Sequence, residues 1–137
     1  MATTTATINI TSDIGPGATI SKTMTMHKLG SSDGIEETGG LRAKKFTATT
    51  ATVVVEEDEY TNTKASKLYM RNTGKDSSNF FYVAKHANDA TSTITETIGK
   101  LYGGDWMLIP YDGATNITVA PSSAETMRLE WMVFAEN

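Results

Sequence analysis

Hydrophobic and polar residues alternate with a period of two along most of this chain, and no window shows clean helical spacing. Beyond a Gly/Pro break, Ile20 and Met24 share one side of such a segment, and Lys22 on the same side favours a position at an edge or rim. The alternation predicts strands with one covered face. The expected strands span residues 8–10, 19–27, 46–55, 67–72, 79–86, 91–99, 106–109, 116–120 and 127–135.

The spacing of these strands indicates the architecture. About eight or nine short strands at intervals of about ten residues are typical of a sandwich or barrel. A chain of 137 residues is long enough to bury one core, and its 23 threonines favour sheet over helix. We therefore expect an all-β fold, a β-sandwich or jelly-roll-like barrel, that forms a single domain over residues 1–137.

Residues 1–7 and 29–45 depart from the alternation. The first segment is small and polar, and we expect either an extended, pairing-competent arm or a frayed terminus. The second is rich in Gly, Ser and charge, and we expect either a long loop that docks on a partner or a surface excursion. The residues that could contact a partner are Ala2, Thr3, Thr4, Thr5, Ile35 and Leu41.

The strands at 67–72 and 79–86 are separated by a turn-like stretch that contains Gly74. This spacing predicts a hairpin. In the second strand, apolar side chains occupy both alternating positions, from Phe80 to Ala84. We therefore expect that strand to lie centrally in its sheet and to be covered on both faces.

The stretch KLYGGDWMLIPYDG, residues 100–113, could be a ligand site or a series of turns and a strand. Two adjacent glycines suit a tight turn with positive φ, and a proline lacks the N–H that a central strand needs. A phosphate-binding loop would be followed by a helix, whereas an apolar run follows here. The residues assigned to turns and core are Gly103, Gly104, Trp106, Pro110, Gly113 and Trp131.

Trp106 carries the main alternative to a purely structural interpretation. Its ring could stack on a sugar, as in carbohydrate-binding sandwiches. The hydrogen bonds would then come from Asp105, Asp112 or Asn116. In the structural interpretation, Trp106 belongs to a core or an interface, and residues 106–109 form a short strand covered on both faces.

The charge pattern argues against several classes of function. The net charge is −4, the isoelectric point is about 5.1 and the basic residues are scattered, so we expect no nucleic-acid partner. No segment is apolar over the roughly 18 residues of a membrane helix. The first residues do not resemble a signal peptide, so we expect synthesis and use in aqueous, cytoplasmic conditions. The chain has no cysteine, which excludes disulfides and thiolate sites.

Motifs for catalysis or metal binding are missing from the sequence. Residues 56–59 are four contiguous carboxylates, but calcium loops space their ligands, so a solvated edge is the favoured interpretation. His27 and His86 lack metal-ligand spacing, and no serine lies in a nucleophile elbow. Paired acids such as Glu125 and Glu130 could be imagined as a glycosidase dyad, but most glycosidase folds are larger. We expect a protein that is not an enzyme and that uses no cofactor or metal.

The second half of the chain contains the segments KLYMRNTG, FFYVAK, ETIGKLYGGDWMLIPYDGATNITVAPSS and RLEWMVF in that order. Over residues 67–134 this order resembles the small β-rich virion proteins of tailed bacteriophages, which include capsid decoration, or cement, proteins. The shared pattern is a strand that ends in Arg-Asn, a Gly-Asp-Trp stretch that leads to a proline, an Asp-Gly turn and an apolar closing strand. Residues 1–66 carry no part of it.

The resemblance implies a structural virion protein on the capsid surface, made in the host cytoplasm. Such a protein would form a homotrimer, bind the major capsid protein and stabilise the head through many weak contacts. Its arm would add a strand to a neighbour's sheet edge. Because tail, baseplate and fibre proteins carry similar sandwiches, a tail component is the alternative. A carbohydrate-binding module is the second alternative, and a small hydrolase is the remotest.

Overall fold

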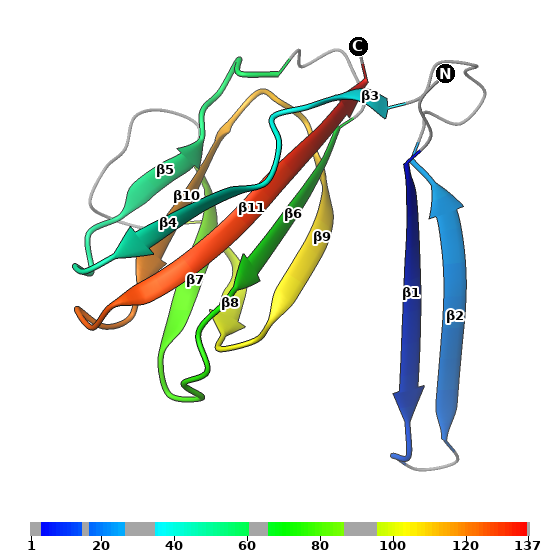
Figure 1. The fold of residues 1–137 in the computed structure, drawn as a ribbon, viewed down its shortest axis with the longest axis horizontal. Coiled ribbons are helices and arrows are strands. Elements are labelled where there is room, and N and C mark those ends of the chain that lie inside the picture. The colour runs from blue at the N-terminus through cyan, green and yellow to red at the C-terminus, as the bar shows by residue number, and fades with distance from the viewer. Residues whose placement is uncertain (1–3, 15–16, 27–34, 61–65, 87–95, 137) are drawn as a thin grey trace.

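The computed structural model describes residues 4–14, 17–26, 35–60, 66–86 and 96–136 (Figure 1). These ranges contain eleven strands and no helix, so nothing in them forms an apolar helix that could span a membrane. The chain is all-β, as the alternation predicts. The strands are β1 Thr5–Ser12, β2 Ala18–Thr25, β3 Ile35–Thr38, β4 Arg42–Phe46, β5 Thr52–Val55, β6 Ser66–Asn72, β7 Phe80–His86, β8 Thr97–Tyr102, β9 Trp106–Tyr111, β10 Asn116–Pro121 and β11 Met127–Glu136.

Two antiparallel sheets lie face to face and form a sandwich (Figure 1). The small sheet has the order β5-β10-β7-β8. In the large sheet β11 is flanked on one side by both β3 and β4, and on the other side by β6 and then β9. Neither sheet closes into a barrel within the described ranges, so the sandwich is found and the barrel is not.

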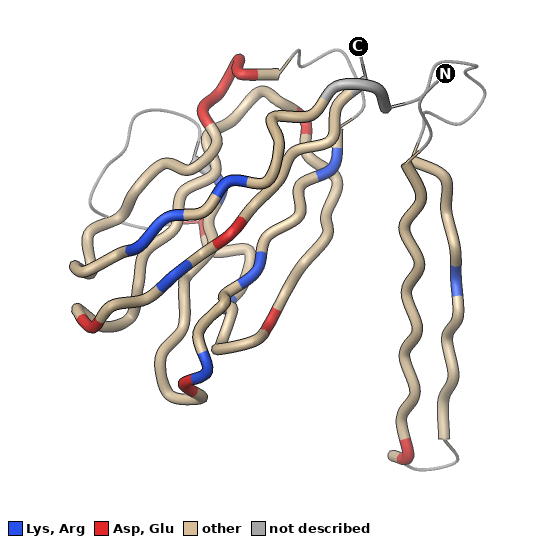
Figure 2. The backbone as a smooth tube through the Cα atoms, in the orientation of Figure 1, with Lys and Arg blue, Asp and Glu red and all other residues tan. Residues whose placement is uncertain are grey.

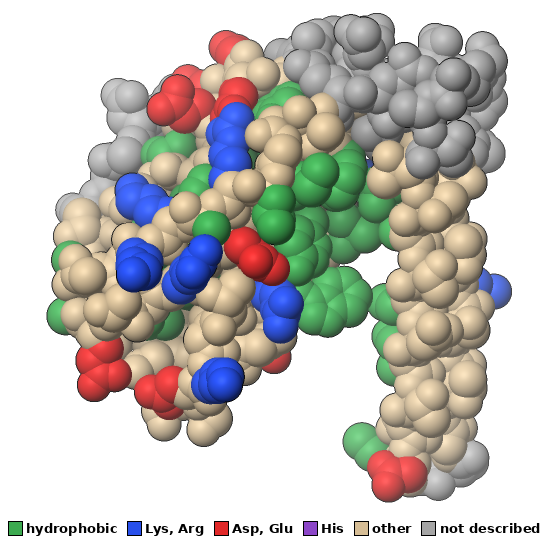
Figure 3. Space-filling view, viewed as in Figure 1, with side chains coloured by type: hydrophobic (Ala, Val, Ile, Leu, Met, Phe, Trp, Pro, Cys, Tyr) green, Lys and Arg blue, Asp and Glu red, His purple; other side chains and the backbone are tan. Residues whose placement is uncertain are grey.

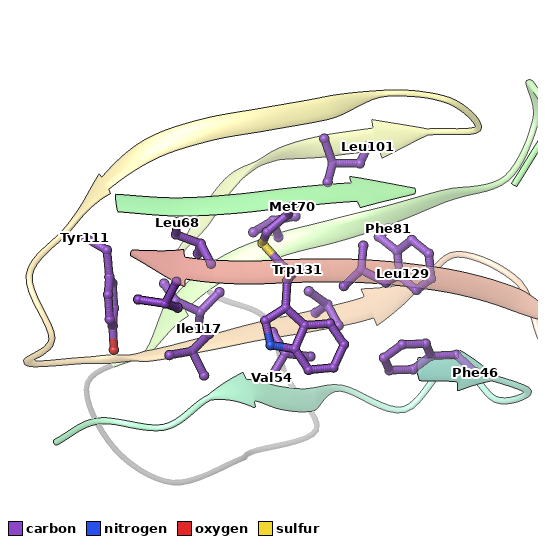
Figure 4. Packing of buried hydrophobic residues seen from close by; sticks show 14 of the residues in the cluster. Phe46, Val54, Leu68, Met70, Phe81, Leu101, Tyr111, Ile117, Leu129 and Trp131 are labelled. Carbon is purple, nitrogen blue, oxygen red and sulfur yellow. The ribbon is translucent and has the colours of Figure 1, made fainter. Parts of the chain in front are cut away.

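The hydrophobic core fills the space between the two sheets (Figure 4). Alternate residues of β11, among them Leu129 and Trp131, point inward from the large sheet, and Phe81 and Ile117 lie on the small sheet. Phe46 and Phe81 meet edge to face with their ring centroids 5.2 Å apart. Burial of each large apolar side chain contributes about 1.5–3 kcal/mol, so this shared layer is what joins the sheets.

Residues 29–45 do not form one long loop, contrary to the expectation. In their described part β3 and β4 lie one after the other along β11 and form an edge strand that is interrupted at residues 39–41. Gly40 has a φ of 72° at this interruption. The exposed charges of β4, which include Lys45, discourage pairing with another chain. This strand could not be recognised in the sequence because it is rich in glycine and charge. Its one large apolar residue in the core is Phe46.

The strong β-forming run at 46–55 is divided between the two sheets. Phe46 ends β4 in the large sheet, whereas Val54 and Val55 belong to β5 in the small sheet. The exposed residues 47–50 connect them. The sequence shows a single β-forming run because β4 and β5, although they belong to different sheets, both contribute apolar side chains to the same core.

The strands β6 and β7 do not pair with each other, so the predicted hairpin was wrong. β6 lies between β11 and β9 in the large sheet, and β7 lies between β10 and β8 in the small sheet. The connector at 73–79 therefore passes from one sheet to the other. β7 is internal, as expected, but its outer side chains Phe80 and Tyr82 are only half-buried, in contrast to the inner Phe81 and Val83.

Asn72, at the end of β6, explains why the chain changes sheets here. Its side chain is buried, and its Oδ1 accepts from the Gly74 N–H at 2.9 Å while its Nδ2 donates to the Leu101 carbonyl at 3.0 Å. Its own N–H donates to the Asp105 carbonyl and its carbonyl accepts from the Gly104 N–H, both at 3.0 Å. These bonds satisfy a buried amide and fix β6 to the β8–β9 turn, which directs the connector away from β6.

The β8–β9 turn passes close to the same connector at Gly103. The Gly103 N–H donates to the Asp76 carbonyl at 3.2 Å, and a Cβ at this position would lie 2.5 Å from that oxygen. Gly104 has a φ of 89°. The two glycines therefore meet different needs, because Gly103 provides space and Gly104 provides the positive φ that the turn was predicted to require.

A second group of hydrogen bonds closes the opposite end of β9. The buried Tyr111 donates its hydroxyl to the Thr115 carbonyl at 3.0 Å and lies 3.4 Å from the Glu56 carbonyl. The Asn116 Oδ1 accepts from the Glu57 N–H at 2.7 Å. Burial, followed by the neighbouring negative charges, raises the pKa of Tyr111 to about 12. The backbone of Glu56 and Glu57, the first two residues of the acidic run, thus belongs to a structural corner.

The strands β1 and β2 form a separate hairpin beside the sandwich (Figure 1). Its eight cross-strand pairs run in unbroken register. Asp13 and Lys22 are the charged residues within ranges 4–14 and 17–26, and the tube in Figure 2 is otherwise uncharged there. From Thr5 onward the expected arm is therefore one strand of a hairpin.

We predict that Gly103→Ala destabilises the protein by about 1–3 kcal/mol, because the new methyl group must displace the backbone of the connector. Urea unfolding checks this through a lower midpoint at unchanged slope. Gly99→Ala is the matched control, since a Cβ there meets nothing within 4 Å. Equal destabilisation of the two variants would contradict the role of the corner.

We predict that the protein loses stability as the pH rises from 10 towards 12. The pKa of Tyr111 is raised above its ordinary value of 10.0, so the unfolded chain releases this proton first. The stabilisation is complete below pH 10 and disappears as the pH passes the folded-state pKa. Phenolate absorbance and unfolding free energy followed with pH check this. Tyr111→Phe should remove this raised phenol titration and flatten the decline, and an unchanged titration curve would refute the assignment.

Candidate interaction surface

The outer face of the large sheet carries apolar side chains that the core does not use. Alternation along β6, β9 and β11 directs them away from the small sheet, and the strand register places Tyr69 opposite both Leu108 and Met132. Figure 3 shows hydrophobic side chains gathered on the side of the sandwich that faces the hairpin. We call this group the outer patch. It consists of Tyr69, Trp106, Leu108, Pro110, Met132 and Phe134, all half-buried or exposed.

Trp106 is the most exposed large side chain of the outer patch, at 53%. It lines a shallow hollow together with Tyr69, Arg71 and Gly104. The expectation that residues 106–109 are covered on both faces was wrong for this position. In a run of four apolar residues the sequence does not show which pair points inward, and here Met107 and Ile109 pack against the core while Trp106 faces outward.

Two polar groups beside Trp106 are paired with Glu130, whereas Lys67, opposite Pro110 and Phe134 in the strand register, adds a positive charge to the same face. The Tyr69 hydroxyl donates to Glu130 Oε1 at 3.1 Å, and Arg71 lies 3.8 Å from the same oxygen. Burial, and then the hydrogen bond to Glu130, raises the pKa of Tyr69. Arg71 lies directly opposite Trp106 in the strand register. The surface beside Trp106 is therefore apolar with an internally compensated charge, which suits contact with another apolar surface.

The hairpin has one apolar and one polar face. Ala6, Ile8 and Ile10 of β1 share a face with Ala18, Ile20, Lys22 and Met24 of β2. The opposite face consists of Thr, Ser and Asn, and its side chains bond across the strands. Thr7 and Thr23 are linked at 2.8 Å, and Ser21 donates to Asn9 Oδ1 at 2.6 Å. The hairpin thus presents a second flat apolar surface.

The other turn and core residues singled out in the sequence lie as follows. Pro110 is in β9, an edge strand of the large sheet, where no ladder bond from it is needed. Gly113 is buried with a φ of 71°. Trp131 is 7% exposed and belongs to the core.

The residues proposed as partner contacts are not gathered at one place. Thr4 and Thr5 lie at the base of the hairpin, whereas Leu41, 62% exposed, interrupts the β3–β4 edge. Ile35 pairs through its backbone with Glu136, and its side chain is not described. Ala2 and Thr3 lie outside the described residues.

The structure does not assemble the sugar site considered for Trp106. Asn116 is buried and engaged by the Glu57 N–H, and Asp112 accepts from Lys85 Nζ at 2.8 Å. This hydrogen bond to Lys85 is the main reason that the pKa of Asp112 is lowered. Asp105 does adjoin Trp106, but its carboxylate accepts from the Tyr102 N–H.

The other candidate polar groups also serve separate partners. Glu125 accepts from Asn79 Nδ2 at 3.1 Å, whereas Glu130 accepts from Tyr69, so the imagined acid pair is divided between two networks. In the acidic run, Glu59 pairs with Arg42. Among the described residues no three His, Cys, Asp or Glu side chains could hold a metal ion together. His27 and the side chain of His86 lie outside the described part.

Sequence reasoning singled out Trp106 but missed its neighbours in the outer patch. Tyr69 was assigned only to a strand, and the partners Met132 and Phe134 come from the far end of the chain. Their signal is in β11, where apolar residues occupy both alternating positions from Trp131 onward. This pattern predicts a strand with two faces to cover.

Comparisons with protein families, curated proteins and solved structures gave no match for this chain.

We predict opposite outcomes for the two tryptophans. Trp131→Ala leaves a cavity in the core and should lower the unfolding free energy by about 3–5 kcal/mol, whereas Trp106→Ala should change it by less than about 0.5 kcal/mol. Urea unfolding at low protein concentration checks both values. A large decrease in the unfolding free energy of Trp106→Ala would show that this ring stabilises the single chain, which would contradict its assignment to a surface that binds a partner.

Proposed function

We propose that this chain is a structural virion protein of a tailed bacteriophage, a capsid decoration protein that stabilises the head. It binds the lattice of the major capsid protein on the capsid surface, and it does so as a homotrimer. The proposal is supported by the resemblance of residues 67–134 to small virion proteins. The sandwich with its outer patch and hairpin is the observation that carries it.

Exposed apolar surfaces of this kind favour a function in binding other proteins. The outer patch and the hairpin leave Trp106, Ile10, Ile20 and Met24 more than two fifths exposed on one small chain. Apolar surface in such quantity is stabilised when a partner covers it. A lattice that offers many copies of the same contact adds their free energies, so each contact can be weak while the shell becomes durable.

We further propose that the chain has no catalytic activity. The polar side chains that could have served in a reaction are committed to the fold, because Asn72 and Asn116 close corners and Glu130 is bonded by Tyr69 and Arg71. The proposed partner contacts are Thr4, Thr5, Ile35 and Leu41, with Ala2 and Thr3 next to them in the chain.

A carbohydrate-binding module is the second candidate function, and the exposed Trp106 beside Tyr69 and Arg71 favours it. An exposed indole can stack on the apolar face of a sugar ring, and the guanidinium offers hydrogen-bond donors. Retention on immobilised polysaccharides that is lost in Trp106→Ala would support this reading over the virion role.

The decisive test separates the heads of the source particle from its tails and counts copies of this chain in each by quantitative mass spectrometry. We expect many copies in heads, in proportion to the major capsid protein, because a decoration protein follows the capsid lattice. A few copies confined to tails would move the protein to the tail, baseplate or fibre class. Its absence from both fractions would refute the virion proposal.

A further inference from the structure

The hairpin cannot account for its own stability. A two-stranded sheet is marginal in water without a covering layer, and its apolar face is open, with Ile10 45% and Ile20 47% exposed. The hairpin also carries almost no charge, so it lacks the usual protection of a free sheet edge. A surface that covers the apolar face would therefore stabilise the hairpin.

The outer patch has the properties of that surface. It is a flat, apolar face of the strands β6, β9 and β11, and sheets pack face to face when both faces are apolar. Trp106 is 53% exposed at one side of it. The polar face of the hairpin would then point to solvent, where its Thr, Ser and Asn side chains are at no disadvantage.

The hairpin does not cover the outer patch of its own chain. Figure 3 shows open space between the two surfaces, with hydrophobic side chains on both sides of it. The base of the hairpin is closed by the Met26 N–H, which donates to the Thr4 carbonyl at 2.8 Å, and Met26 itself is only 4% exposed. This hydrogen bond closes the hairpin itself, and the apolar face of the hairpin stays open.

We propose that the hairpin of one copy packs its apolar face on the outer patch of a neighbouring copy. Each copy gives a hairpin and receives one, and around a three-fold axis such contacts close into a ring. This proposal names the self-contact of the homotrimer proposed above, and it does not require the capsid.

The dimensions of the hairpin fit a contact that is repeated around a ring. A strand of eight residues is about 27 Å long and two strands are about 10 Å wide, so one packed face removes about 500 Å² from water when both partners are counted. A single contact of this size falls below the roughly 1,000 Å² of a specific pairwise interface, but in a closed ring each copy takes part in two such contacts, which together remove about 1,000 Å² from water. Exchange around a ring therefore explains how so small an element could hold copies together.

The absence of native cysteine allows a direct test by cross-linking. One batch of the full chain carries Ile10→Cys and a second batch carries Leu108→Cys. The two are mixed and then oxidised or treated with a short bismaleimide. Because each chain has one thiol, a product that contains both variants joins two copies. We expect such a product at twice the 14.8 kDa of one chain.

The matched control replaces Ile10→Cys with Thr11→Cys, the next residue on the opposite face of the hairpin. It should give about tenfold less product, because its thiol has no raised effective concentration at the patch. Equal yields from the two mixtures would overturn the proposal. So would a chain carrying both Ile10→Cys and Leu108→Cys that cross-links only within itself and keeps the mass of one chain.

Light scattering on the purified protein gives an independent readout. Ile10→Asp with Ile20→Asp adds two like charges to one cross-strand pair of the apolar face, and Thr11→Asp with Thr19→Asp adds the same charges to the neighbouring pair of the polar face. We expect the first variant to have the mass of one chain and the second to keep the mass of the assembly. Identical masses for the two variants would refute the proposal. Since no capsid is present, these results test the contact between copies independently of the mass-spectrometric count in heads and tails.

Discussion

Four hydrogen bonds that converge on the buried Asn72 fix how the two sheets of the sandwich are connected. They satisfy the amide side chain and the backbone of one residue with groups from the β6–β7 connector, β8 and the β8–β9 turn. A buried amide without such partners would be costly, so the corner permits one route for the chain. That route leads from the large sheet to the small one, and after β8 back to the large one.

The same corner positions the surface through which we propose that the protein acts. Asp105, whose carbonyl accepts from Asn72, immediately precedes Trp106, so the path of the backbone at the turn decides which way the indole points. Arg71, the residue before Asn72, lies opposite that indole. The outer patch is therefore built on strands that pack against the interior of the sandwich, whereas the hairpin that we pair with it is a separate two-stranded sheet.

The fold class followed from periodicity and threonine content, because these report directly on local backbone preference. The connectivity did not follow, since alternation shows that a strand has a covered face without showing which sheet supplies the cover. β6 and β7 resembled a hairpin for this reason, and residues 29–45 resembled a loop because the edge strand in their described part needs few apolar anchors. The candidate surface could be predicted only in part. Trp106 was conspicuous in the sequence, but Met132 and Phe134 became its neighbours only through pairing between distant strands.

The position of β11 in the large sheet has a consequence for the order in which this protein folds during synthesis. β11 is the last strand, yet it pairs with β3, β4 and β6, so the centre of the large sheet is empty until the ribosome has delivered it. The β1–β2 hairpin, by contrast, is complete within the first 25 residues. Nascent chains would therefore expose the apolar residues of the hairpin long before any copy offers the outer patch that we propose to cover them, and self-association has to wait for β11.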